Sequence, residues 1–148
     1  MDTSGRLGDR FTDQELMDID LNLLDIKSGD PETYRRSRAS PCKPTLDYAR
    51  RLSALGRPMW VRFVLVPGLT DAWDNVEKVA DICAGLKSLQ RVEILRFHQM
   101  GKTKWDKLGL DYPLADVEPP SAELSEARAR PVPQSRPYRL LGRDAPRR

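Results

Sequence analysis

Residues 59–98 read MWVRFVLVPGLTDAWDNVEKVADICAGLKSLQRVEILRFH, and this stretch decides the fold class. Two apolar runs rich in β-branched residues, Met59 to Val66 and Val92 to Phe97, are typical of buried strands. Between them, residues 74–86 place apolar side chains at helical spacing. A strand, a helix and a second strand in this order predict a parallel βαβ unit with a right-handed crossover.

The same alternation extends upstream. Residues 19–27, IDLNLLDIK, predict an earlier strand, and residues 44–56, PTLDYARRLSALG, predict an amphipathic helix with Pro at its start and Gly at its end. Either Asp71 or Asp74 can cap the start of the later helix. The chain therefore alternates strand, helix, strand, helix, strand.

The length of the chain limits how many such units it can hold. A (β/α)₈ barrel uses about 250 residues, or roughly 31 per unit, so residues 1–130 supply about four units. We therefore predict an α/β fold, the C-terminal half of a partial TIM-like barrel, whose exposed strand edge would ordinarily pair with another strand.

The composition changes near the C-terminus. Residues 121–130, SAELSEARAR, predict a short polar helix capped by Ser121. Residues 131–148 are rich in Pro and Arg and lack periodicity, so we predict a disordered tail that follows a domain of residues 1–130.

Charge and hydropathy exclude several classes of protein. The 148 residues carry a net charge of +3, but residues 131–148 hold five arginines and one acid, so the remainder is close to neutral. Nucleic-acid binding is therefore not expected. No apolar run approaches the roughly 18 residues of a membrane span, and the N-terminus lacks the features of a secretory signal, so we expect no membrane association and a cytoplasmic location.

The chain has only two cysteines, Cys42 and Cys83. Their wide separation excludes a CxxC redox pair and a self-contained zinc or iron–sulfur motif. We expect no iron–sulfur ligands in this chain.

Four charged or titratable residues lie in or near the ends of predicted strands. Asp25 and Lys27 are two residues apart, so a strand places both on one face, where they can form a rim ion pair or hold a zwitterion. Arg62 stands in an apolar strand and must find an anion, which can be a ligand carboxylate or a structural partner, Asp25 or Glu93. His98, the only histidine, follows the last strand directly, which favours a functional role.

Two connecting segments have mixed interpretations. Residues 66–71, VPGLTD, form a compact turn that can approach a ligand with its backbone or can simply connect two elements. Residues 99–105 fit a mobile binding loop or a solvated turn.

Taken together, several stretches resemble the pyruvate formate-lyase activating enzymes, which are glycyl-radical activases of the radical S-adenosylmethionine superfamily. They are DTSG at 2–5, DLNLLDIKSGDPETY at 20–34, PTLDYARRL at 44–52, VRFVLVPGLTD at 61–71, RVEILRFHQMGKTKWDKLGLDYPL at 91–114 and PPSAEL at 119–124. The combination of VPGLTD with FHQMGKTKW is far more specific than either motif alone.

The resemblance implies roles for residues at matching positions. Asp25, Lys27, Arg62 and His98 would surround the methionine portion of S-adenosylmethionine. Asp2 and Thr3, together with Asp25, resemble a monovalent-cation position, and the loop after His98 would lie near the glycyl-radical protein, pyruvate formate-lyase.

The chain also departs from the family pattern. The CxxxCxxC loop that ligates the [4Fe–4S] cluster and the GGE segment are missing, and Arg96 stands where the family has Pro. Two hypotheses follow: a fragment of an activase that is inactive alone because it cannot hold the cluster, or a non-catalytic module that docks on a glycyl-radical enzyme or on an N-terminal partner chain.

Overall fold

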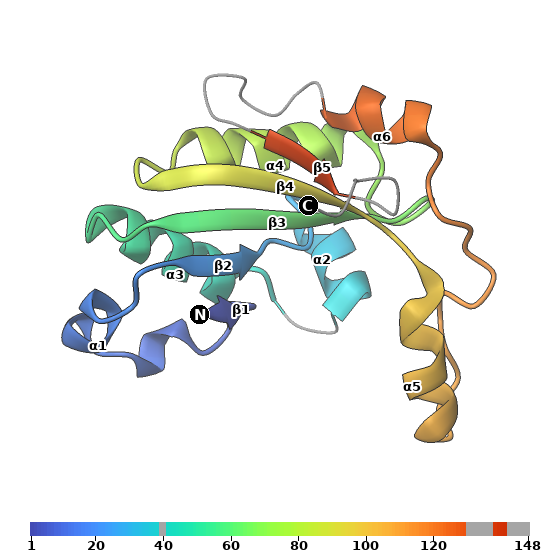
Figure 1. Cartoon of the computed structure of the whole chain (residues 1–148), viewed down its shortest axis with the longest axis horizontal. Coiled ribbons are helices and arrows are strands. Elements are labelled where there is room, and N and C mark those ends of the chain that lie inside the picture. Colours follow the sequence, from blue (N-terminus) through green and yellow to red (C-terminus); the bar gives the residue numbers. More distant parts are fainter. Residues whose placement is uncertain (39–40, 130–137, 142–148) are drawn as a thin grey trace, which may run out of the picture.

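A computed structural model describes residues 1–38, 41–129 and 138–141 as one five-stranded parallel sheet with helices (Figure 1). The strands lie in chain order: β1 (Asp2–Thr3), β2 (Asn22–Asp25), β3 (Met59–Leu65), β4 (Leu89–Arg96) and β5 (Tyr138–Leu141). The helices are η1 (Gly8–Arg10), α1 (Asp13–Met17), α2 (Pro31–Arg38), α3 (Lys43–Ala54), α4 (Trp73–Ala84), η2 (Gln99–Gly101), α5 (Lys102–Lys107) and α6 (Ala122–Ala129). The predicted strand and helix order is confirmed.

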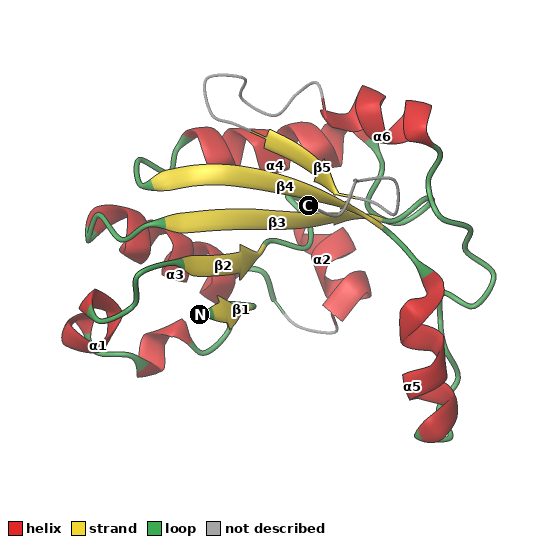
Figure 2. Ribbon diagram, in the orientation of Figure 1, coloured by secondary structure: helices red, strands yellow, loops and turns green. Residues whose placement is uncertain are grey.

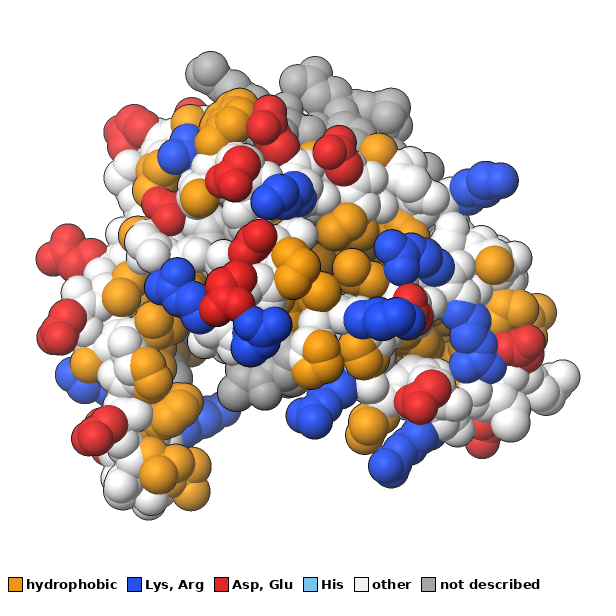
Figure 3. Space-filling view, turned by 180° about the vertical axis from the view of Figure 1, so that it is seen from behind, with side chains coloured by type: hydrophobic (Ala, Val, Ile, Leu, Met, Phe, Trp, Pro, Cys, Tyr) orange, Lys and Arg blue, Asp and Glu red, His pale blue; other side chains and the backbone are white. Residues whose placement is uncertain are grey.

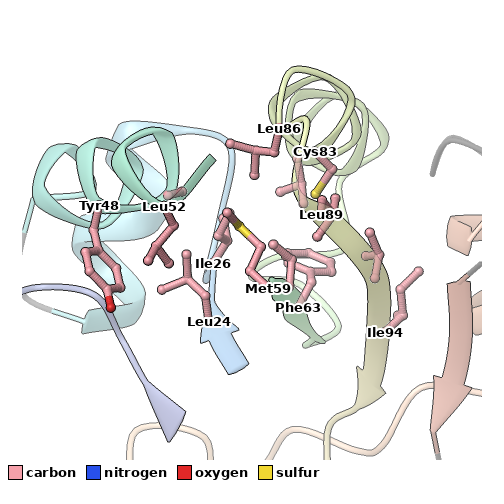
Figure 4. Close-up of a cluster of buried hydrophobic side chains, with 14 of the residues drawn as sticks. Leu24, Ile26, Tyr48, Leu52, Met59, Phe63, Cys83, Leu86, Leu89 and Ile94 are labelled. Atoms are coloured by element: carbon pink, nitrogen blue, oxygen red, sulfur yellow. The ribbon is translucent and has the colours of Figure 1, made fainter. Parts of the chain in front are cut away.

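Helices α3 and α4 pack on one face of the sheet, behind the strands in the view of Figure 2. Along β3, Met59, Val61, Phe63 and Leu65 are buried and alternate with half-buried residues. Side chains from α3 and α4, including Leu52 and Cys83, meet the buried β3 residues in one core (Figure 4). Because each large apolar side chain contributes about 1.5–3 kcal/mol on burial, this layer accounts for the adherence of the helices to the sheet.

The outer surface of these helices is charged. Figure 3 shows this side of the molecule, where acidic and basic side chains are interspersed among smaller apolar areas. Alternation of the two signs is consistent with the nearly neutral charge of the chain before its tail.

The helix boundaries agree with the sequence except at one cap. Gly56 ends the α3 region with φ +65, and the Ser121 hydroxyl accepts a hydrogen bond from Leu124 N at 3.1 Å, as predicted for α6. The proposed caps of α4 were wrong, because the N-cap is Ala72 and makes no side-chain hydrogen bond. Asp71 instead accepts a hydrogen bond from Gly68 N at 2.8 Å, inside the preceding turn.

Several short helices were not predicted. The first turn of α1 contains a capping box in which Thr12 N donates to Glu15 at 2.7 Å and Glu15 N donates to Thr12 at 3.2 Å. Its Thr-x-x-Glu signal is visible in the sequence. Residues 99–105, interpreted as a loop, form η2 and most of α5, which projects away from the sheet (Figure 1).

The predicted disordered tail differs from the structure at four positions. Residues 138–141 form β5, which pairs in parallel with β4 from Val92 to Leu95. The outer edge of β4 presents backbone hydrogen-bonding groups, and a short apolar segment satisfies them by pairing there. The rest of residues 131–148 lie outside the described residues, so the boundary at 130 stays a prediction.

Within the described part of the chain, no helix is both long and apolar enough to cross a membrane.

Candidate functional site

A cluster of four charged side chains lies on the face of the sheet opposite α3 and α4. The pairing register places Asp25 beside Arg62, and Asp2 of β1 beside Leu23, which is two residues before Asp25 and therefore faces the same way. Lys27 follows β2 by two residues and shares this face. The side chains along β3 on this face are half-buried rather than buried, so this face is partly exposed to solvent.

Arg62 is the centre of the cluster. Its Nε donates to Asp25 Oδ1 at 2.9 Å, its Nη1 donates to Asp2 Oδ2 at 2.9 Å, and its Nη2 contacts both carboxylates. The Arg62 and Asp25 side chains are each 18% exposed, whereas Asp2 is 62% exposed. Burial alone would lower the pKa of Arg62, but hydrogen bonds to Asp2 and the charges of both carboxylates outweigh it, so the pKa is raised.

Lys27 completes the cluster. Its Nζ donates to Asp25 Oδ2 at 2.8 Å, so Asp25 holds one cation on each carboxylate oxygen. Of the alternatives left open by the sequence, Asp25 and Lys27 do form an ion pair, and Arg62 pairs with Asp25. Glu93 lies 3.7 Å from Arg91 instead. Two cations and two carboxylates make the cluster electrically neutral.

His98 lies beyond the cluster. It is exposed, and its Nδ1 accepts a hydrogen bond from Met100 N at 3.4 Å as the N-cap of η2. Glu93 pairs in register with Arg62. His98 lies five residues after Glu93, which corresponds to about 16 Å of extended chain. His98 is therefore at the same carboxyl end of the parallel sheet as Lys27, but its hydrogen bond is made within its own loop.

Sequence reasoning missed a polar contact that supports the cluster from behind. Asn75 of α4 is 2% exposed, and its Oδ1 accepts hydrogen bonds from Ser28 Oγ at 2.6 Å, Gly29 N at 2.9 Å and Asp30 N at 3.1 Å. Its Nδ2 donates to Thr70 O at 2.7 Å. One amide thus joins the loop after β2, next to Lys27, to the turn after β3. The Ser-Gly-Asp turn was the available signal.

Two further contacts fix these loops. Asp30 accepts a hydrogen bond from Thr33 N at 2.9 Å in the first turn of α2, and this backbone hydrogen bond is the main cause of its lowered pKa.

In the VPGLTD turn, the Thr70 hydroxyl accepts a hydrogen bond from Val66 N and donates one to Val64 O, both at 2.8 Å. The turn therefore connects and positions elements through its side chains.

The η2–α5 segment carries an exposed apolar surface. Its members share high solvent exposure and lie on or just beyond the two helices: Met100, Trp105, Leu108 and Leu110. Gln99 anchors the segment, since its Nε2 donates to the backbone oxygens of Leu114 and Val117 at 2.8 and 2.6 Å. We call Met100, Trp105, Leu108 and Leu110 the α5 surface.

The described residues contain no group of three or more His, Cys, Asp or Glu side chains that could hold a metal ion. Cys42 precedes α3 and Cys83 is buried in α4. The residues expected at a monovalent-cation position make other contacts in this structure. Asp2 and Asp25 bind Arg62, and Thr3 Oγ1 accepts a hydrogen bond from Gly5 N at 3.0 Å.

A surface pocket of about 550 Å³ lies between η1 and α3, apart from the cluster. Among its charged lining residues, Lys43 contacts Asp47 at 2.5 Å and Arg51 Nε donates to Asp13 at 2.8 Å.

The chain is similar in sequence to pyruvate formate-lyase-activating enzymes, although no family model matches it. It is 44% identical over 111 residues to the enzyme of Streptococcus mutans, covering 74% of this chain and 42% of that protein. It is 42% identical over 113 residues to the enzyme of Staphylococcus aureus, covering 76% of this chain and 45% of that protein. The chain thus spans less than half the length of these relatives.

Solved structures with low sequence identity share the fold. A domain of pyruvate-formate lyase-activating enzyme from Bacteroides vulgatus has a TM-score of 0.75 and 19% identity, covering 95% of this chain and 79% of that chain. SuiB of Streptococcus suis, solved with S-adenosylmethionine, has a TM-score of 0.69 and 16% identity, covering 95% and 32%. A radical SAM methyltransferase from Sphaerobacter thermophilus has a TM-score of 0.68 and 18% identity, covering 95% and 39%.

The predicted α/β partial-barrel fold is therefore confirmed. Over the residues matched, the chain is a homologue of the pyruvate formate-lyase-activating enzymes.

Proposed function

We propose that this chain is part of a pyruvate formate-lyase-activating enzyme and binds the methionine portion of S-adenosylmethionine through the cluster of Asp25, Lys27 and Arg62. The observation that carries the proposal is the pair of cationic groups, Arg62 and Lys27, held on the two oxygens of one largely buried carboxylate. An arrangement of this kind suits a zwitterionic ligand, because the cations attract its carboxylate and Asp25 attracts its ammonium.

The roles of the side chains follow from their geometry. The planar guanidinium of Arg62 can bind a carboxylate through two parallel hydrogen bonds, and Lys27 adds a second positive charge beside it. Asp25 orients both cations, and Asn75 holds the loop that follows Lys27. His98 lies in the loop after β4, so it would contact the same ligand only if that ligand extended along the sheet from the cluster to this loop.

The residues of this chain do not fit an iron–sulfur cluster. Two cysteines on different helical units are too few for the usual set of thiolates. In the family, S-adenosylmethionine and a [4Fe–4S] cluster together generate the glycyl radical on the protein substrate. We therefore propose that the chain is a fragment that is inactive alone, with a cytoplasmic location as the sequence predicts.

The proposed monovalent-cation position also fits poorly as the side chains are arranged. The guanidinium of Arg62 already contacts both Asp2 and Asp25, and thus supplies the positive charge that a cation would bring. We derive no step through such a cation.

A second candidate function is supported by the α5 surface. Four large apolar side chains, Met100, Trp105, Leu108 and Leu110, are exposed on a segment that projects from the sheet (Figure 1). Exposed apolar groups of this kind are typical of protein contacts. The alternative is therefore a non-catalytic module that docks on a glycyl-radical enzyme, such as pyruvate formate-lyase, or on an N-terminal partner chain.

Calorimetric titration of the full chain with S-adenosylmethionine and with L-methionine tests the first proposal. Arg62→Ala should weaken binding by about 2 kcal/mol, roughly 30-fold in Kd, because a ligand carboxylate loses its main partner. Arg50→Ala is the matched control, since Arg50 is an exposed arginine on α3 whose guanidinium pairs with Asp47, away from the cluster. Equal affinities of the Arg62→Ala variant and the unaltered chain would refute the assignment.

Anaerobic reconstitution with iron and sulfide tests the second part of the proposal. The chain should not acquire a stoichiometric [4Fe–4S] absorbance spectrum or iron content. Recovery of both would show that it holds the cluster by itself.

A further inference from the structure

Glu93 is a second carboxylate that lies beside Arg62 on the face of the charged cluster. It belongs to β4 and pairs in register with Arg62, and the two side chains share a face because the residue before each of them belongs to the core. Neighbouring strands are about 4.8 Å apart, so Glu93 flanks Arg62 on one side as Asp25 does on the other. Despite this symmetry, the Arg62 guanidinium donates to Asp25 at 2.9 Å, and its hydrogen bonds run toward β2 and β1.

A β-bulge near the start of β4 places Arg91 between Trp60 and Glu93. The register shifts between Met59 and Trp60, so that Gln90 is the extra residue of β4 and Trp60 pairs with Arg91. The Trp60 Nε1 donates to Gln90 Oε1 at 3.3 Å. The Arg91 guanidinium lies 4.0 Å from the centre of the Trp60 ring, and its Nη1 lies 3.7 Å from Glu93 Oε1. Trp60 therefore holds Arg91 on the face where Glu93 needs a counter-ion.

The Glu93 carboxylate depends on this cation. Its side chain is 10% exposed, and a nearly buried carboxylate without a counter-ion is costly. Among the side chains that the structure describes, the cation paired with Glu93 is Arg91. Without Arg91, the long side chain of Arg62 can turn to Glu93 across one strand spacing, and the guanidinium would then leave the position from which it binds Asp25.

We infer that Arg91 is a positioning residue of the ligand site: by pairing with Glu93, it keeps this second carboxylate away from Arg62 and leaves the guanidinium free to bind a ligand carboxylate. The inference rests on the proposed function, since it assumes that Arg62 receives such a ligand. Arg91 acts through Glu93 and Arg62 and is not itself a ligand-binding residue.

A double-mutant cycle tests the inference by calorimetric titration of the full chain with L-methionine and with S-adenosylmethionine. Arg91→Met removes the charge and should weaken binding roughly three- to tenfold, because Arg62 turns to Glu93. Glu93→Gln alone should change Kd by less than about twofold, because Arg91 already holds this carboxylate. In the Arg91→Met background, the same Glu93→Gln substitution should restore Kd to within about twofold of the unaltered chain.

The comparison of the two backgrounds separates positioning from a simple effect of charge. If Arg91 acted only through its long-range field, Glu93→Gln would change Kd by the same factor in both backgrounds. Equal factors would therefore overturn the inference, and so would unchanged binding by Arg91→Met. Circular dichroism verifies that each variant is folded.

Three single substitutions serve as controls. Arg91→Lys keeps the positive charge and should bind within about twofold of the unaltered chain. Arg50→Met removes an exposed arginine of α3 that pairs with Asp47, and should leave Kd unchanged. Arg139 of β5 pairs in register with Glu93, and a loss of affinity in Arg139→Met equal to that in Arg91→Met would overturn the assignment to Arg91.

A crystal structure of the Arg91→Met variant gives a readout that needs no ligand. It should place a guanidinium nitrogen of Arg62 within about 3.2 Å of a Glu93 oxygen, whereas an Arg62 that still binds Asp25 and leaves Glu93 alone would overturn the inference. If Arg62→Ala weakens binding but the cycle is additive, the proposed function stands and the inference fails. If Arg62→Ala leaves binding unchanged, the proposed function fails and the positioning role of Arg91 fails with it.

Discussion

Replacement of Asn75 by Ala is the sharpest structural test of the way the loops around the cluster are held. The substitution deletes an amide that accepts hydrogen bonds from Ser28, Gly29 and Asp30 and donates one to Thr70. Ser28, Thr70 and Asn75 are all at most 2% exposed, so water does not replace the lost partner without local opening.

The magnitude follows from the number of groups left without a partner. A buried polar group that loses its hydrogen bond costs about 1–3 kcal/mol. Gly29 and Asp30 are half-buried, so their backbone N–H groups can be hydrated after a small movement, and the Ser28 hydroxyl keeps its hydrogen bond to Asp30 O at 3.0 Å. The main cost therefore comes from the buried carbonyl of Thr70. We expect the free energy of unfolding to fall by about 1–3 kcal/mol, a substantial fraction of the 5–15 kcal/mol that is typical of a domain.

Urea denaturation followed by far-ultraviolet circular dichroism measures this change. The m-value should stay constant, since the surface exposed on unfolding is the same. Glu77→Ala is the matched control, because Glu77 is an exposed residue on the same helix, and it should change stability by less than about 0.5 kcal/mol. A cost below about 1 kcal/mol for Asn75→Ala would refute the reasoning, because the amide would then not be the main link between the two loops.

Two other predictions concern the same rim and the N-terminal helix. Gly29→Ala should destabilise the chain by about 1–3 kcal/mol, because its Cβ would lie 2.5 Å from a side-chain atom of α4. Gly85→Ala, whose Cβ would meet its nearest neighbour at 3.5 Å, is the control in the same denaturation assay. The pKa of Glu15 is lowered by its hydrogen bond from Thr12 N, so its contribution is present above pH 4.5 and is lost as pH falls through the lower folded-state pKa. Thr12→Ala should remove this part of the pH dependence, and an unchanged stability profile between pH 3 and 5 (about the range in which such carboxyl groups titrate) would count against the capping box.

The sequence predicted the elements that carry the cluster because their signals are local. The apolar run around Arg62 and the two amphipathic helices have periodicities that can be read within 15 residues, and all three are confirmed as β3, α3 and α4. Short elements were harder to predict. Strand β1 has two residues and α1 has five, so neither forms a repeating pattern, and each depends on packing against the rest of the chain.

The residues of the candidate site fall into the same two groups: some follow from local sequence patterns, and others only from tertiary packing. By itself, the sequence determined that Asp25 and Lys27 share a face, because a strand alternates with a period of two, and that Arg62 needs an anion, because it stands in an apolar strand. Only the tertiary structure decided which anions it finds. Asp2 and Arg62 are 60 residues apart, and Ser28 and Asn75 are 47 residues apart. These contacts arise from the parallel register of β1, β2 and β3 and from the packing of α4 behind them, and no local pattern in the sequence encodes a distance between segments that meet only after the sheet has formed.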